Sequence, residues 1–135
     1  MNRLVFTALL LFISISAISQ ENPCWKTAMA QSEMNRCADE EARAADAELN
    51  RVYQDLLKKT QANANARKKL RDAERAWLAF RAAHLQALYP ASDKQRDYGS
   101  IFPMCYSKVA TAMTKERTTQ LRRMLEDKDP CDTGD

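Results

Sequence analysis

The sequence is short of residues that break helices. Its 135 residues include only two glycines, Gly99 and Gly134, and four prolines, at positions 23, 90, 103 and 130. Between these positions the chain is rich in alanine, leucine, lysine, arginine, glutamate and glutamine, which all favour helix. No segment alternates apolar and polar residues as a half-buried strand does. These absences argue against a β-protein and predict an all-α fold.

The sequence also lacks the motifs of common enzyme classes. It has no glycine-rich phosphate loop, no serine nucleophile elbow and no CxxC or HxxxH pair. The single histidine, His84, has no cysteine nucleophile or carboxylate at a recognisable motif spacing. A lone histidine can be a general base, a ligand or a pH switch, but on a helix seam we interpret it as structural. We expect a protein that is not an enzyme and has neither a cofactor nor a metal.

The first residues have the pattern of a secretory signal. Arg3 supplies the positive start, an apolar run spans residues 4–15, and Ala17-Ile18-Ser19 fits the small-x-small cleavage rule. The run is shorter than the roughly 20 residues of a membrane-spanning helix, although a retained anchor is the alternative. We expect a signal peptide at 1–19 and one mature domain at 20–135, periplasmic or secreted and without stable membrane insertion.

Export also bears on the cysteines and the charge. All four cysteines (Cys24, Cys37, Cys105 and Cys131) follow the leader, and an even number in an oxidising compartment favours two disulfides, with free buried thiols as the alternative.

Without Arg3 the chain has 20 basic and 18 acidic side chains, a net charge of +2 spread along the helices. Such patterning is typical of solvated helix faces, so we expect no nucleic-acid partner.

Three long helices are predicted. The first spans about residues 31–59, and its apolar residues recur every three or four positions: Met34, Cys37, Ala38, Ala45, Leu49, Val52 and Leu56. The second follows a polar break at 60–66, ends at Tyr89-Pro90, and carries the seam Ala66, Leu70, Ala73, Trp77, Phe80, His84 and Leu88. The third spans about 106–125, with Tyr106, Val109, Ala110, Met113, Leu121, Met124 and Leu125 inward.

The short break makes the first two helices antiparallel neighbours. A turn centred near residue 62 places Ala45 opposite Trp77 and Cys37 opposite His84. We expect a small, disulfide-stabilised helical bundle, built on this long antiparallel hairpin plus a third helix.

Two arginines stand out beside these seams. Arg117 falls on the apolar stripe of the third helix, and Arg81 follows Trp77 by one turn. With Asp46 and Asn50 of the first helix they are expected to form a partly buried polar network that fixes helix register. A site for an anionic ligand is the alternative.

Five segments together resemble the LprI-type lysozyme-inhibitor family of small exported bacterial proteins. They are QSEMNRCA (31–38), ADAELNRVYQDL (45–56), AERAWLAFRAAH (73–84), GSIFPM (99–104) and MTKERTTQL (113–121). The pairing of ADxELNxxY with a later AWLxFR is the specific part. The resemblance implies a helical periplasmic or surface protein that inhibits lysozyme. It also implies a structural signature: Asp46, Leu49, Asn50, Tyr53, Trp77, Phe80, Arg81, Thr114, Arg117 and Leu121.

The resemblance has consequences for the disulfides. The family usually has cysteines at the positions of His84 and Val109, glutamine at Glu74 and a capping threonine at Ala30. The joint loss of the two cysteines implies that Cys24–Cys37 is retained and that Cys105–Cys131 is new. Cys37–Cys105 with Cys24–Cys131 stays open, because positions 37, 84 and 105 share one end of the hairpin.

The leading hypothesis is a binding protein that occludes the active site of lysozyme or another peptidoglycan hydrolase. Its candidate target-binding loop is 91–104, where basic or hydroxyl side chains can pair with catalytic carboxylates: Lys94, Arg96, Tyr98 and Ser100. An immunity-type protein against a secreted toxin is one alternative. An envelope structural or stress protein with no enzyme target is another.

Overall fold

The computed structural model describes residues 22–126, and within this range every regular element is helical. A 3-10 turn, η1 (Pro23–Lys26), precedes the long helices α1 (Gln31–Lys59) and α2 (Ala64–Leu88). The short helix α3 (Lys94–Tyr98) and the long helix α4 (Phe102–Leu125) follow. The predicted all-α class is confirmed. The proposed signal peptide and Cys131 lie outside the described residues.

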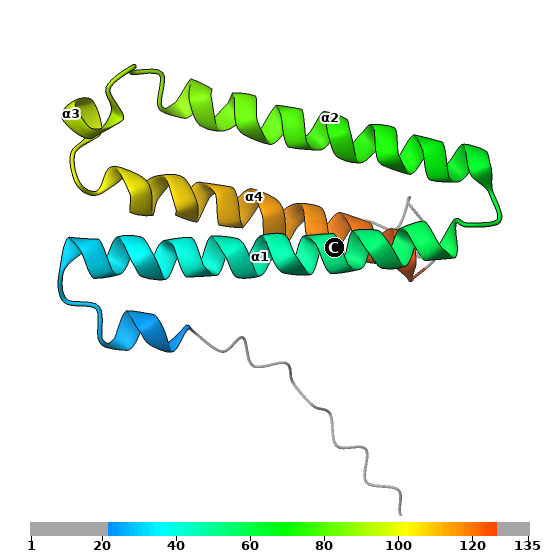
Figure 1. Ribbon diagram of the computed structural model, residues 1–135, viewed down its shortest axis with the longest axis horizontal. Helices are drawn as coiled ribbons and strands as arrows, with labels where there is room; N and C mark the ends of the chain where they lie inside the picture. Colours follow the sequence, from blue (N-terminus) through cyan, green and yellow to red (C-terminus); the bar gives the residue numbers. More distant parts are fainter. Residues whose placement is uncertain (1–21, 127–135) are drawn as a thin grey trace, which may run out of the picture.

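Helices α1 and α4 run in the same direction, and α2 runs in the opposite direction (Figure 1). Near the N-terminal ends of α1 and α4, Asn35 donates a hydrogen bond to the carbonyl of Ser100 at 2.9 Å. Near their C-terminal ends, the Lys59 ammonium donates to the carbonyl of Leu125 at 2.7 Å. Both contacts require α1 and α4 to be parallel neighbours, with α2 antiparallel to them.

The closest helix pair is therefore not the predicted one. α1 packs along the length of α4, whereas α2 contacts α4 over a smaller area and approaches α1 less still. The small side chains of Cys37, Ala38 and Ala45, all buried on α1, let the α4 backbone come close. The expected pairing of Ala45 with Trp77 across a tight hairpin is wrong for this reason.

The face of α4 that meets α1 is rich in threonine. Thr111, Thr114 and Thr118 are buried beside Leu121. Each hydroxyl donates to the carbonyl four residues earlier at 2.8 Å, so it can be buried without an unpaired polar atom. The sequence pattern instead put Tyr106 and Met124 inward, but their side chains are 38% and 53% exposed.

The inward face of α2 is also rotated from the predicted seam. Its buried and half-buried members are Leu70, Glu74, Trp77, Arg81 and Leu85, at spacings of three and four residues. Phe80 is 58% exposed, and His84 is exposed as well. Glu74, which the predicted seam left out, points inward because it pairs with Arg117 there. Arg81 is partly buried beside Asp46, as the predicted polar network requires.

The main core lies toward the end of the bundle where α1 and α4 finish. Leu49, Val52 and Leu56 of α1 meet Leu70 of α2 and Leu121 of α4. Tyr53, Leu57, Trp77 and Leu125 pack around this cluster. The opposite end, which carries α3, is held by the aromatic and polar contacts described next.

Candidate functional site

Arg81 connects all three long helices. Its Nη1 atom donates to Asp46 Oδ1 of α1 and to Thr114 Oγ1 of α4, each at 2.6 Å. Its guanidinium also lies 5.0 Å from the centre of the Trp77 ring. The expected link between Arg81 and Asp46 is present, with Thr114 as the third member. Asn50 is exposed and lines a small pocket next to Asp46.

A second charged pair joins α2 to α4. Arg117 contacts Glu74 Oε2 through Nε and Nη2, each at 3.1 Å, and both side chains are at most 13% exposed. Arg117 also lies 6.0 Å from the Trp77 ring centre, so two guanidinium groups contact this ring. Arg117 thus pairs with Glu74, rather than with Asp46 and Asn50 as the sequence suggested. These contacts brace the helices.

The remaining signature residues divide between core and surface. Leu49 and Leu121 belong to the core, and Tyr53 packs against it. Phe80 is exposed, and its ring lies next to that of His84 in a tilted arrangement, with ring centres 5.6 Å apart. His84 thus lies at the surface of α2 rather than in the predicted seam.

Two of the four candidate loop residues hold the loop itself together. The Lys94 ammonium donates to the carbonyls of Tyr89 and Ala91, where it also neutralises the negative end of α2. The Tyr98 hydroxyl accepts a hydrogen bond from the Ala91 backbone N–H at 3.0 Å. Both side chains are half-buried, so their polar ends face the loop.

The other two candidates lie at the surface. Arg96 is exposed and pairs with Asp97 at 3.1 Å, while Ser100 is exposed next to Ile101. Gly99 ends α3 with φ of 70°, a backbone conformation that favours glycine. Asn35 of α1 holds the Ser100 carbonyl at 2.9 Å. The loop therefore presents Arg96, Ser100 and Ile101 from a braced backbone.

An aromatic cluster under this loop was not foreseen. Tyr89, Tyr98, Phe102 and Tyr106 contact one another with ring centres 5.2 to 6.2 Å apart. Burial raises the pKa of the Tyr89 hydroxyl. The spacing of four residues between Tyr98, Phe102 and Tyr106 was the available signal, but the expected helix start near 106 separated them. The cluster attaches α3 to the ends of α2 and α4.

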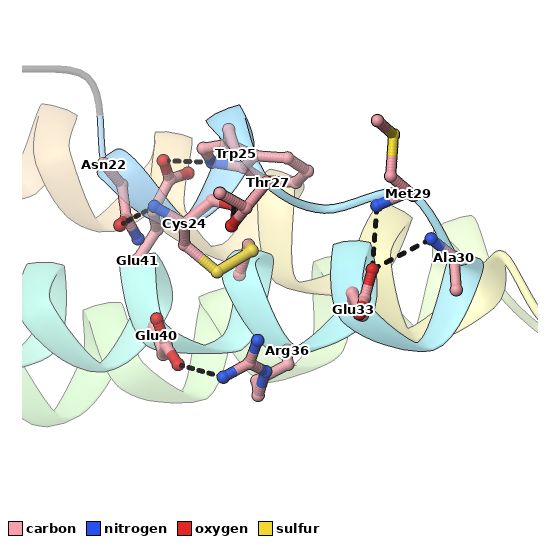
Figure 2. The surroundings of a disulfide bond; sticks show 11 residues. Asn22, Cys24, Trp25, Thr27, Met29, Ala30, Glu33, Arg36, Glu40 and Glu41 are labelled. Carbon is pink, nitrogen blue, oxygen red and sulfur yellow. Dashed lines mark hydrogen bonds and ion pairs between the residues drawn. A yellow bond between two sulfur atoms is a disulfide. The ribbon is translucent and has the colours of Figure 1, made fainter.

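The N-terminal corner is closed by a disulfide between Cys24 and Cys37 (Figure 2). Beside it, the Trp25 indole N–H donates to Glu41 at 2.6 Å, and Lys108 of α4 lies 4.8 Å from the Trp25 ring centre. This bond confirms one predicted pair and excludes the alternative of Cys37 with Cys105. Cys105 is a half-buried thiol in the structure. Its proposed partner, Cys131, is outside the described residues, so Cys105–Cys131 stays a prediction.

Residues 22–126 lack two further kinds of feature. No group of three or more histidine, cysteine, aspartate or glutamate side chains is arranged to hold a metal ion in this range. None of the helices described is both long and apolar enough to cross a membrane.

Comparison with known proteins connects this architecture to a family. The family model described as "Lysozyme inhibitor LprI" matches residues 24–121. The chain belongs to the LprI family. An uncharacterized protein of Rhizobium meliloti (strain 1021) is 33% identical over 118 residues, which cover 79% of this chain and 82% of that protein. No solved structure matches. The LprI match runs from the disulfide through α3 to Leu121, so it includes the loop and its supports.

Proposed function

We propose that this protein is an exported inhibitor of lysozyme or another peptidoglycan hydrolase, and that it acts by inserting residues 91–104 into the enzyme's active-site cleft. The single observation that supports the proposal most is the presentation of exposed Arg96, Ser100 and Ile101 at one end of the bundle, within a family described as lysozyme inhibitors. Export to the periplasm or the exterior, with residues 1–19 removed, is part of the same proposal.

The loop is suited to binding because its backbone is already ordered. Asp93 caps α3 by accepting from the Arg96 N–H at 3.0 Å, and the Gly99 N–H donates to the Gln95 carbonyl at 2.9 Å. With the contacts of Lys94 and Tyr98, the backbone is held before any partner arrives. A pre-ordered loop loses little conformational entropy on binding, which favours affinity.

The chemistry of the loop fits an acidic cleft. Glycoside hydrolases of this type use two carboxyl groups that flank the scissile bond. Arg96 can form a paired hydrogen bond with a carboxylate once it leaves Asp97, and the Ser100 hydroxyl can donate to a second one. The mature chain has a net charge of only +2, so we expect short-range contacts rather than long-range attraction to set the affinity.

The test is a titration of lysozyme activity on cell walls with the purified, disulfide-bonded protein. We expect the lysis rate to fall with added protein, and Arg96→Ala to weaken inhibition about tenfold, the effect of one charge-assisted hydrogen bond. Lys69→Ala removes the same charge from an exposed position of α2 and should inhibit as the parent does. Undiminished lysis at a large molar excess would contradict inhibition of lysozyme.

A pull-down from periplasm extends the test to other hydrolases. Recovery of a different peptidoglycan hydrolase, lost with Arg96→Ala, supports the wider form of the proposal. Recovery of a secreted toxin instead would favour the immunity role, and recovery of no enzyme would favour an envelope structural role. Either of these two results would overturn inhibition of a hydrolase.

A further inference from the structure

An open cleft runs between α1 and α2, because α2 rests mainly on α4. One part of the cleft has a volume of about 730 Å³ and a second part about 230 Å³, and Tyr53, Glu74 and Leu78 line both. Leu78 is 43% exposed although its neighbours on the inward face of α2 are covered. The cleft is thus a continuous groove with an apolar floor between two helices that do not close on each other.

One wall of the larger part is strongly basic. It carries four cationic side chains of α2, in a row along the helix: Arg67, Lys68, Arg71 and Arg75. Asp72 accepts from Lys68 at 2.7 Å and from Arg75 at 2.5 Å, and Glu74 is engaged by Arg117. The two carboxylates in the wall are therefore already paired.

This leaves two arginines without a counterion. Arg67 and Arg71 lie one turn apart, and within residues 22–126 neither has a hydrogen-bond or ion-pair partner. The Nε atom of Arg67 is also buried with no hydrogen-bond partner. Because both side chains line the cleft without an ion-pair partner, their guanidinium groups can form charge-assisted hydrogen bonds with an incoming oxyanion.

We propose that the α1–α2 cleft binds a single-chain anionic amphiphile, with its carboxylate or phosphate head on Arg67 and Arg71 and its apolar body along Tyr53 and Leu78. The volume of the larger part falls within the roughly 300–1,000 Å³ of small-molecule sites. Its wall is more charged than is usual for such sites, which suits a ligand with a charged head. A polyacidic chain fits less well, because its successive carboxylates would meet Asp72 and Glu74. The site is separate from the loop and does not depend on the proposed inhibition.

The test is calorimetric titration of the whole disulfide-bonded protein with dodecanoate, dodecyl phosphate, inorganic phosphate and uncharged dodecyl maltoside, each below its aggregation concentration. The two anionic amphiphiles should bind at least tenfold more tightly than the uncharged one, since charge-assisted hydrogen bonds contribute on this scale. A preference between the first two ligands identifies the head group. Inorganic phosphate should bind more weakly than dodecyl phosphate, and the difference measures how much the apolar body of the ligand contributes to affinity.

Matched variants locate the site. Arg71→Gln should weaken dodecanoate binding about tenfold, and the double variant with Arg67→Gln still further. Lys69→Gln removes one charge from the same helix outside the cleft and should bind as the parent does. Leu78→Ser should weaken dodecanoate but leave inorganic phosphate unchanged. Circular dichroism checks that each variant is folded.

Two results would overturn the proposal. Dodecanoate binding that is unchanged in the folded double arginine variant would place the ligand elsewhere. Binding of polyglutamate at Arg67 and Arg71, with no binding of dodecanoate, would make the cleft a site for acidic protein segments instead.

Discussion

Arg81 Nη1 lies 2.6 Å from Asp46 Oδ1, which joins α2 to α1 across the open cleft. The Arg81 side chain is 20% exposed and that of Asp46 is 53% exposed, so the pair lies at the boundary between interior and solvent. The same nitrogen holds Thr114 of α4. The Arg81 side chain therefore holds α1, α2 and α4 at a fixed spacing, although α2 packs against the other two helices over only part of its length.

Replacing Arg81 should destabilise the fold. We expect Arg81→Met to lower the free energy of unfolding by about 2 kcal/mol, below the cost of breaking a fully buried pair, because the remaining Asp46 carboxylate is hydrated. Urea denaturation measures the loss. Arg75→Met breaks only the exposed pair with Asp72 and should cost less than about 1 kcal/mol. Equal losses in the two variants would show that Arg81 has no bracing role.

The Glu74–Arg117 pair gives a second prediction. Glu74→Leu leaves the Arg117 guanidinium nearly buried without its carboxylate, and we expect a loss of about 3 kcal/mol. Glu74→Gln keeps an acceptor for Arg117 and should lower the free energy of unfolding less. The resemblance to the family implies that relatives usually have glutamine where this chain has Glu74. Thermal unfolding of the parent and of the two variants measures these differences in stability. A Glu74→Leu variant as stable as the parent would show that the pair adds nothing over an apolar contact.

The start of α1 is only half capped. Glu33 accepts from the backbone N–H groups of Met29 and Ala30, at 2.8 and 3.0 Å, but the Ala30 side chain has no oxygen to bond back. Ala30→Ser completes the reciprocal pair and should raise the free energy of unfolding by about 1 kcal/mol. Chemical denaturation measures the gain. The same change at exposed Ala47, inside the helix, should be slightly destabilising.

Acid should weaken the contact between α1 and α4 at Glu48. Hydrogen bonds from Arg51 first, and then from Arg122, lower the pKa of Glu48 from 4.5 to about 2. Because the folded pKa is the lower one, this stabilisation is fully present above pH 4.5 and is lost as pH falls from 4.5 toward 2. The side chain is 35% exposed, so solvent screens the effect and it should shrink with added salt.

The measurement is the melting temperature as a function of pH for the parent and for Glu48→Gln. The decline of the parent between pH 4.5 and 2 should be steeper than that of the variant, and the difference should narrow at high salt. Parallel curves would contradict the assignment to Glu48.

The sequence predicted where the helices lie along the chain better than it predicted which of their faces pack together. Periodicity located α1 at residues 31–59, and Tyr89-Pro90 marked the end of α2. It misjudged the inward face of α2 because burial of Glu74 depends on Arg117, a partner far along the chain. Thr111, Thr114 and Thr118 were missed because their hydroxyls are satisfied within the helix, which composition does not reveal.

The loop shows the same limit. The charges of residues 91–104 were visible in the sequence, but not which of them would be used inside the loop. Lys94 and Tyr98 bond to Tyr89 and Ala91, groups that converge only when α2 has ended and α3 has formed. Arg96 and Ser100 remain as the exposed pair. Packing of α1 on α4, rather than on its neighbour in the chain, likewise depends on small residues on both helices.

That parallel packing has a consequence for how the chain folds. The contacts between α1 and α4 join residues 65 to 74 positions apart, as in Asn35 with Ser100 and Glu48 with Arg122. Helical bundles usually fold fast because their contacts are local, and here the principal interface is distant in sequence. The Cys24–Cys37 bond closes only a 13-residue separation and shortens none of these connections. Folding should therefore be slower than for a bundle of similar length in which consecutive helices form the main interface, with its rate limited by the meeting of α1 and α4.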